Sequence, residues 1–210
     1  MPLHFDSKEF GNRRNHLLEL MAGSELDGML IFRQESMFYL TGYDSFGYVF
    51  FQCLFLGGDG KLILLTRVPD LRQAQNTSIV EDIRIWVDGP EVNPALQLKE
   101  ILREYGCAGK RLGVEYDSYG LTAKNGKMLD SALDGFCELI DASGLVNRLR
   151  VVKSPEELVY VRKAAELADD ALDEAHRLVK DGCDEGELLA AMQGAVFRGG
   201  GDYPGNEFII

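Results

Sequence analysis

Two patterns of apolar residues alternate along the chain and predict its secondary structure. Uninterrupted apolar runs are typical of buried strands, whereas apolar residues that recur every three or four positions are typical of amphipathic helices. Runs of the first kind predict strands at residues 29–32, 48–56, 61–66, 83–87, 111–116 and 136–140. The second pattern predicts helices that begin after Asp6 and at residues 94–106, 121–133, 155–181 and 184–198, with a short helical turn at 36–40.

Capping residues mark where several of these helices begin. Asp6 is expected to cap the first helix, Asn93 the helix at 94–106, and Ser36 the short turn. Ser154 and Glu157 fit a capping box at the start of the long helix at 155–181.

The order of the elements predicts the fold class. The tetrapeptide GGDG at residues 57–60 is a hairpin signal, so the two strands that it joins are expected to be antiparallel. Strands and helices alternate after this hairpin. We therefore predict an α/β domain over residues 1–150, with a mixed β-sheet flanked by helices.

The remainder, residues 151–210, reads as a linker and the start of a second domain. The long helix carries one predicted apolar stripe and should end at Gly182, and a further helix follows it. The stripe comprises Leu158, Val161, Ala165, Ala168, Leu172, Ala175 and Val179. A strand is expected to open at Phe208. Both helices need a sheet to cover them, so we predict that this second domain is incomplete.

The amino-acid composition limits the classes of partner that the protein is expected to bind. Asp and Glu outnumber Lys and Arg by 34 to 22, which gives a net charge of −12. Such a surface repels phosphate groups, so we expect no nucleic-acid partner and no membrane association. The first residues lack the pattern of a secretory signal, and the four cysteines form no CxxC pair. We therefore expect buried free thiols and a cytoplasmic protein.

Four segments of the chain resemble one known family. The junction sequence KSPEELVYVRKAAELADDAL at residues 153–172 is similar to the domain junction of the creatinase/aminopeptidase P/prolidase family. The segment LDGMLIFRQESMFYLTGY at residues 26–43 resembles the first strand and turn of that family's N-terminal domain. DSFGYVFFQ and GGGDYPGNEFII look closest to bacterial Xaa-Pro peptidase or ectoine-hydrolase-like members.

The resemblance implies a metal-dependent hydrolase. In that family, a C-terminal "pita-bread" domain holds two divalent metals (Mn, Co or Zn) through Asp, His and Glu side chains, and a metal-activated water attacks an amide carbon. The matching positions would lie beyond Phe208, so we expect no catalytic residue, no metal ligand and no cofactor in this chain, and no activity of the chain alone. An acidic cluster at residues 169–174 is expected to be the solvated face of the long helix.

The resemblance also implies that the N-terminal domain borders the active site, often that of the other subunit of a homodimer. The candidates for contact with substrate are Arg33, Tyr39, Tyr43, Asp44, Phe46, Tyr48 and Arg67. An arginine can bind a substrate carboxylate, and aromatic side chains can line a pocket for a small ring. The structural alternative, which we favour, is that the aromatic residues are core or dimer contacts. In that alternative Arg33 pairs with Glu35 or Asp44, and Arg67 forms a surface ion pair.

Two functions remain open from the sequence. The first is the substrate-selecting and dimerising part of a dinuclear-metal hydrolase that acts on Xaa-Pro peptides or on a small cyclic or guanidino compound, as an ectoine-hydrolase- or creatinase-like enzyme would. The second is a metal-free module of the same architecture that binds peptides or proteins.

Overall fold

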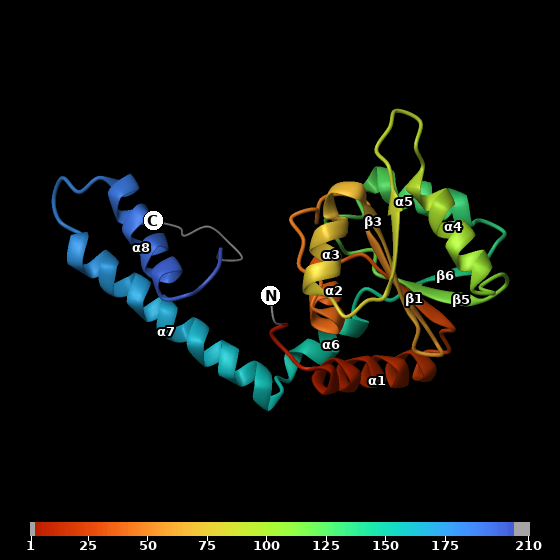
Figure 1. Ribbon diagram of the computed structural model, residues 1–210, viewed down its shortest axis with the longest axis horizontal. Coiled ribbons are helices and arrows are strands. Elements are labelled where there is room, and N and C mark those ends of the chain that lie inside the picture. Colours follow the sequence, from red (N-terminus) through yellow and green to blue (C-terminus); the bar gives the residue numbers. More distant parts are fainter. Residues whose placement is uncertain (1–2, 204–210) are drawn as a thin grey trace. The chain divides into compact units, whose positions relative to one another are not determined.

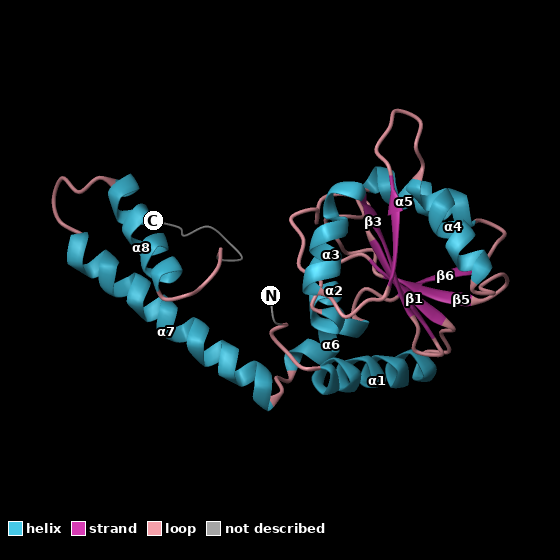
Figure 2. Ribbon diagram, in the orientation of Figure 1, coloured by secondary structure: helices cyan, strands magenta, loops and turns pink. Residues whose placement is uncertain are grey.

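The computed structural model describes residues 3–203 and divides into two compact units, Met1–Val152 and Lys153–Ile210. Each unit is described by itself. The first contains the only sheet among the described residues, and the second is a pair of helices (Figures 1 and 2).

The sheet of the first unit is mixed, as predicted. Its six strands are β1 (Gly28–Ile31), β2 (Cys53–Gly57), β3 (Leu62–Arg67), β4 (Asp82–Trp86), β5 (Arg111–Val114) and β6 (Glu138–Asp141), in the order β4-β3-β2-β1-β5-β6. The GGDG hairpin is confirmed, because β2 and β3 are antiparallel and the Gly57 N–H donates to Lys61 O (3.0 Å).

Strand direction decides which loops meet. β2 is antiparallel to both β1 and β3, while β4 is parallel to β3, and β5 and β6 are parallel to β1. Every strand except β2 therefore ends at the same edge of the sheet, which we call the carboxyl edge. β2 begins at this edge, so the segment that leads into β2 crosses it.

Helices cover both faces of the sheet. The bounds are α1 (Ser7–Gly23), α2 (Gln34–Thr41), α3 (Leu71–Thr77) and α6 (Leu145–Val151) for one face, and α4 (Pro94–Glu104) and α5 (Ala123–Leu133) for the other. Successive side chains of a strand point to opposite faces. Accordingly, Met29 and Ile31 pack with the first set of helices, and Leu30 packs with the second.

Several local predictions are confirmed. The side chain of Asp6 accepts from the Glu9 N–H (2.8 Å), and Asn93 caps α4 by accepting from the Ala95 N–H (3.0 Å). Thr122 provides the equivalent cap of α5.

Other local predictions are wrong. Ser36 does not begin a helix, because α2 already begins at Gln34. Residues 48–52 are not part of a strand: a turn covers residues 46–49, where the Phe50 N–H donates to Gly47 O (2.9 Å), and the strand begins at Cys53. The short helices α3 and α6 were not predicted, and in α3 only Ala74 is buried, which leaves no apolar period to detect.

The second unit is a hairpin of α7 (Pro155–Leu178) and α8 (Glu185–Arg198). The capping box of Ser154 and Glu157 is confirmed, but α7 ends before Gly182. The predicted stripe is not the face that α8 covers. The buried residues of α7 are Leu167 and Ala171, one position away from Ala168 and Leu172. The strand expected at Phe208 lies outside the described residues.

Two adjacent valines mark the junction between the units. The side chains of Val151 and Val152 are 74% and 79% exposed, and helix α7 begins at Pro155. We expect a protease of broad specificity to cut at residues 151–154 first and to leave a stable fragment that contains the whole sheet. Mass spectrometry of the fragments checks this, and a first cut between β4 and β6 would contradict the division.

Candidate functional site

The candidate site lies along the carboxyl edge of the sheet. Arg33 follows β1, Arg67 ends β3, and Glu115 and Asp117 follow β5. α2 leaves β1 on one face of the sheet, whereas α5 follows β5 on the other face. α/β proteins commonly bind ligands where the connections of neighbouring parallel strands change face in this way.

Arg33 is held by the loop after β5. Its guanidinium group donates to Asp117 O through Nε (3.0 Å) and Nη2 (2.6 Å), and Nη2 also lies 2.6 Å from Asp117 Oδ2. The partner is therefore Asp117, and the predicted pairing with Glu35 or Asp44 is wrong. A substrate carboxylate would have to share this guanidinium group with Asp117, whose side chain is 79% exposed.

A buried acid fixes the position of Arg33. Glu115 is fully buried; its Oε2 accepts from the Arg33 N–H (2.8 Å) and its Oε1 from Ser36 Oγ (2.6 Å). The carboxyl group thus satisfies donors in the first turn of α2, which explains why this helix begins before Ser36. Burial raises the pKa of Glu115, and the hydrogen bonds from Ser36 and Arg33 oppose that rise.

Tyr39 and Tyr43 point into the domain. The ring of Tyr39 packs against the guanidinium group of Arg13, whose Cζ lies 4.5 Å from the ring centroid. Tyr43 is completely buried, and its hydroxyl group donates to Gln52 Oε1 (2.6 Å). Burial raises the pKa of Tyr43. Tyr43 therefore supports the segment that crosses the edge from the inside, whereas Tyr39 packs against α1.

Exposure alternates along the segment between α2 and β2. Tyr43, Ser45 and Gly47 are buried, whereas Asp44, Phe46 and Tyr48 are exposed. Phe46 is 76% exposed and Tyr48 is 49% exposed, so these two aromatic rings are not core residues. The backbone of Asp44 is fixed by a hydrogen bond, since its N–H donates to Thr77 Oγ1 (3.1 Å).

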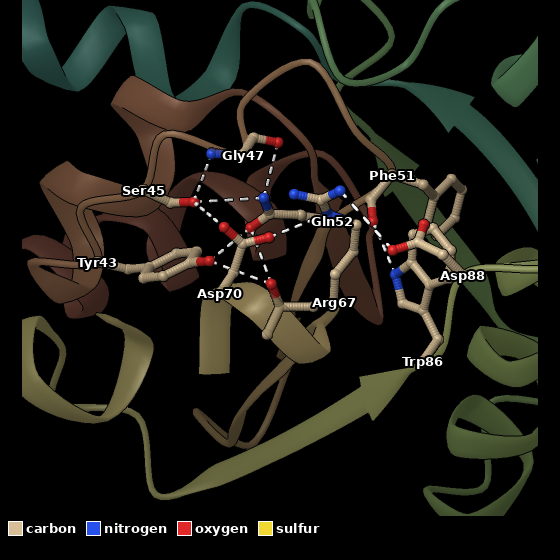
Figure 3. Close-up of polar contacts among 10 residues, drawn as sticks. Tyr43, Ser45, Gly47, Phe51, Gln52, Arg67, Asp70, Trp86 and Asp88 are labelled. Atoms are coloured by element: carbon tan, nitrogen blue, oxygen red, sulfur yellow. Dashed lines mark hydrogen bonds and ion pairs between the residues drawn. The ribbon is translucent and has the colours of Figure 1, made fainter. Parts of the chain in front are cut away.

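The buried side of this segment is a polar network (Figure 3). Gln52 Nε2 donates to Gly47 O (2.7 Å), and the Gly47 N–H donates to Ser45 Oγ (2.9 Å). Ser45 Oγ donates to Asp70 Oδ1 (3.2 Å). None of Ser45, Gln52 and Asp70 was predicted to be a site residue, although a glutamine inside the apolar run YVFFQCLFL is a signal of a buried polar contact.

Arg67 extends the network toward β4. Its Nε donates to Asp70 Oδ2 (3.1 Å), and its guanidinium carbon lies 3.4 Å from the centroid of the Phe50 ring. The exposed fractions of the Arg67 and Asp70 side chains are only 13% and 8%, so the predicted surface ion pair is in fact largely buried. The indole N–H of Trp86 donates to Phe51 O (3.0 Å), which anchors the far end of the segment.

A second segment adds an aromatic ring that the sequence analysis missed. Tyr119 is 76% exposed, and its ring centroid lies 6.2 Å from that of Tyr48 in an edge-to-face arrangement. We call Phe46, Tyr48, Phe50 and Tyr119 the aromatic surface. Gly120 packs beneath it, because a Cβ atom there would lie 2.9 Å from Phe50 O and 3.1 Å from Tyr48 O.

No metal site is found among residues 3–203, because no group of three or more His, Cys, Asp or Glu side chains there has a suitable arrangement. In the acidic cluster on α7, Asp169, Asp170 and Asp173 are exposed, and Glu174 pairs with Arg177 (2.6 Å). Among the same residues, no helix is both long and apolar enough to cross a membrane. All four cysteines are free, but only Cys53 and Cys107 are buried.

A hollow of about 560 Å³ lies at the opposite edge of the sheet, beside the β2–β3 hairpin. Two ammonium groups at its rim are already paired, Lys110 with Asp27 (3.2 Å) and Lys61 with Asp59 (3.5 Å). This hollow is remote from the aromatic surface, and its charges are compensated, so it is not part of the candidate site.

Comparison with known proteins identifies the first unit. Residues 13–152 match the family described as the creatinase/prolidase N-terminal domain. The chain belongs to this family. The match ends at Val152, at the junction between the two units of this creatinase/prolidase-type chain. The predicted resemblance is thereby confirmed.

Curated relatives extend the similarity into the second unit. An ectoine hydrolase of Halomonas elongata is 28% identical over 220 residues, covering 96% of this chain and 54% of that protein. A creatinase of a Bacillus species is 27% identical, covering 92% of this chain and 46% of that protein. The chain thus spans about half the length of these relatives.

Solved structures share the fold. A dipeptidase from Pyrococcus horikoshii superposes with a TM-score of 0.71 at 24% identity, covering 89% of this chain and 49% of that one. An Xaa-Pro dipeptidase from Bacillus anthracis gives 0.72 at 20% identity, covering 90% and 49%. The mixed α/β fold is therefore that of the family's N-terminal domain, and the curated relatives named above are hydrolases.

Proposed function

We propose that the first unit is the substrate-selecting part of a hydrolase that cleaves Xaa-Pro peptides or a small cyclic or guanidino compound. The observation that carries this proposal is the exposed aromatic surface at the carboxyl edge. Removing rings such as Phe46 and Tyr48 from water is favourable, so their exposure on a fixed segment is typical of a binding surface. Their flat faces suit a small ring such as that of proline.

The catalytic groups belong, in this proposal, to a part of the protein that is not in this chain. Two divalent metals (Mn, Co or Zn) would supply an activated water there. The described residues do not form a metal site, so we assign them only binding and positioning roles, and we expect the 210-residue chain to be inactive alone. Arg33 would give up part of its hydrogen bonding to Asp117 and donate to a substrate carboxylate instead. A guanidinium group has several N–H donors and can contact two acceptors.

We further propose that the complete protein is a cytoplasmic homodimer in which the aromatic surface faces the active site of the other subunit. This arrangement would explain why the surface is exposed in a single chain. The charge of −12 argues against nucleic acid and membranes as partners.

The experiment is a comparison of variants of the complete protein. Replacing Phe46 and Tyr48 together by alanine is expected to lower kcat/KM for an Xaa-Pro dipeptide or ectoine by about 10–200-fold, because the pocket for the ring is lost. The control is Leu96→Ala on α4, where an apolar side chain is also 51% exposed. The double variant of Phe46 and Tyr48 and the Leu96→Ala variant should bind the same amount of metal.

Equal kcat/KM values for the two variants would contradict the proposed role of the aromatic surface. A complete protein that binds no metal, hydrolyses none of these substrates and still binds peptides would instead support the metal-free binding module.

A further inference from the structure

Gln52 occupies the point where the aromatic segment joins the sheet. It is only 3% exposed and has polar partners on every side. Its Oε1 accepts from Tyr43 Oη (2.6 Å) and from Thr66 Oγ1 (3.1 Å), and its Nε2 donates to Gly47 O (2.7 Å). A neutral amide suits this position because its oxygen accepts on one side while its nitrogen donates on the other.

Gly47 is enclosed by these groups. A Cβ atom there would lie 2.2 Å from Gln52 Nε2 and 2.7 Å from both carboxylate oxygens of Asp70. Ser45 Oγ accepts from the Gly47 N–H, so both polar groups of this residue are held from the inside. The neighbours of Gly47 in sequence, Phe46 and Tyr48, are the exposed rings.

This arrangement explains why large rings remain in water. A flexible segment would turn Phe46 or Tyr48 toward the core to remove apolar area from solvent. The buried hydrogen bonds oppose that rotation, because breaking them would leave polar groups without partners in a low-dielectric interior. A satisfied polar network of this kind fixes one conformation.

We propose that Gln52 is the positioning residue of the aromatic surface and acts on Phe46 and Tyr48 through the carbonyl group of Gly47. The use of the surface in substrate selection rests on the proposed function, whereas the positioning itself does not. Two different experiments therefore separate the two statements.

The first experiment measures amide hydrogen exchange by NMR in the 210-residue chain. In Gln52→Leu, the Gly47 and Phe50 amides are expected to exchange at least about tenfold faster than in the wild type, because Gly47 is released. The amide of Glu115, which donates to Leu30 O within the sheet (2.9 Å), should be unchanged and serves as the internal reference.

Thr66→Val is the matched control. It removes another partner of Gln52 Oε1 from the same network but leaves the bond from Gln52 to Gly47 intact. The Gly47 and Phe50 amides should keep their protection in this variant. If Gln52→Leu does not fold, Gln52→Met keeps the length of the side chain and removes the donor, so the same amides are compared there. Unchanged amides in the Gln52 variant, or equal losses in both variants, would overturn the proposal.

The second experiment uses the complete protein. If the proposed function is correct, Gln52→Leu should raise KM by about tenfold or more and leave kcat within about twofold, because a disordered surface binds substrate less well without altering the reacting groups. Faster amide exchange with an unchanged KM would support the positioning role and contradict the proposed function. A loss of kcat alone would contradict a role in binding.

Discussion

Replacement of Glu115 by leucine is expected to lower the free energy of unfolding by about 3–5 kcal/mol. The reason is the loss of a buried acceptor. Arg33 N–H and Ser36 Oγ both donate to this carboxyl group, and no water can reach the fully buried site to replace it. Urea unfolding of wild type and variant measures the difference.

Glu115→Gln is the matched control for shape. The amide oxygen can still accept from the Arg33 N–H, and the amide nitrogen can donate to Ser36 Oγ, so the cost should stay below about 1.5 kcal/mol. If the leucine and glutamine variants lost the same free energy of unfolding, the hydrogen bonds to Glu115 would not account for its contribution to stability.

Wild type and Glu115→Gln also test the titration of Glu115. Its pKa is raised above the ordinary value of 4.5 in the folded state, so the folded protein holds this proton to a higher pH than the unfolded chain does. Ionisation of Glu115 therefore lowers stability as the pH rises from 4.5 through the folded pKa. Asp27, Asp82 and Asp141 have lowered pKa values and contribute the opposite slope in both proteins.

The difference in the free energy of unfolding between wild type and Glu115→Gln isolates the titration of Glu115. Relative to wild type, Glu115→Gln should gain stability as the pH rises through this window, because glutamine has no proton to lose. Urea unfolding at several pH values measures it, and a difference that does not change with pH would contradict the raised pKa.

Gly120→Ala is expected to lower the free energy of unfolding by about 1–3 kcal/mol and to separate Tyr119 from Tyr48. The added Cβ atom meets the carbonyl oxygens of Phe50 and Tyr48, which are backbone atoms and cannot rotate away. NMR contacts between the two tyrosine rings report the separation, and thermal or urea unfolding reports the cost.

The same glycine-to-alanine change at Gly11 is expected to have the opposite effect on the free energy of unfolding. Gly11 lies inside α1, and a Cβ atom there would meet nothing within 4 Å. Alanine should therefore stabilise the helix by about 0.5–1 kcal/mol. If Gly120→Ala were as harmless as Gly11→Ala, the two segments of the aromatic surface would not be packed as described.

Features that depend on neighbours in sequence were predictable. The GGDG hairpin and the caps at Asp6, Asn93 and Ser154 each depend on residues within a single turn, and the structure has all of them. Glu115 was not predictable in the same way, because the residue whose N–H it accepts lies 82 positions earlier in the chain. Sequence patterns cannot show such a pairing, which only the register of β1 and β5 creates.

The candidate site was predicted in part. The run YVFFQCLFL reads as one long strand, but the Gln52 side chain donates to Gly47 O and the strand begins only at Cys53. On α7, both the predicted stripe and the face with Leu167 are apolar, and periodicity alone does not say which one α8 covers. Only tertiary packing decides between two faces of similar character.

The alternating burial of residues 43–48 has a consequence for how such proteins diverge. Odd-numbered positions in this segment, such as Tyr43 and Ser45, belong to the interior, and changing them alters stability. Even-numbered positions, such as Phe46 and Tyr48, carry the outward side chains and can change without disturbing the sheet. If the aromatic surface selects substrate as proposed, a lineage could thus acquire a new substrate by substitutions at every second residue, while natural selection for folding preserves the residues between them.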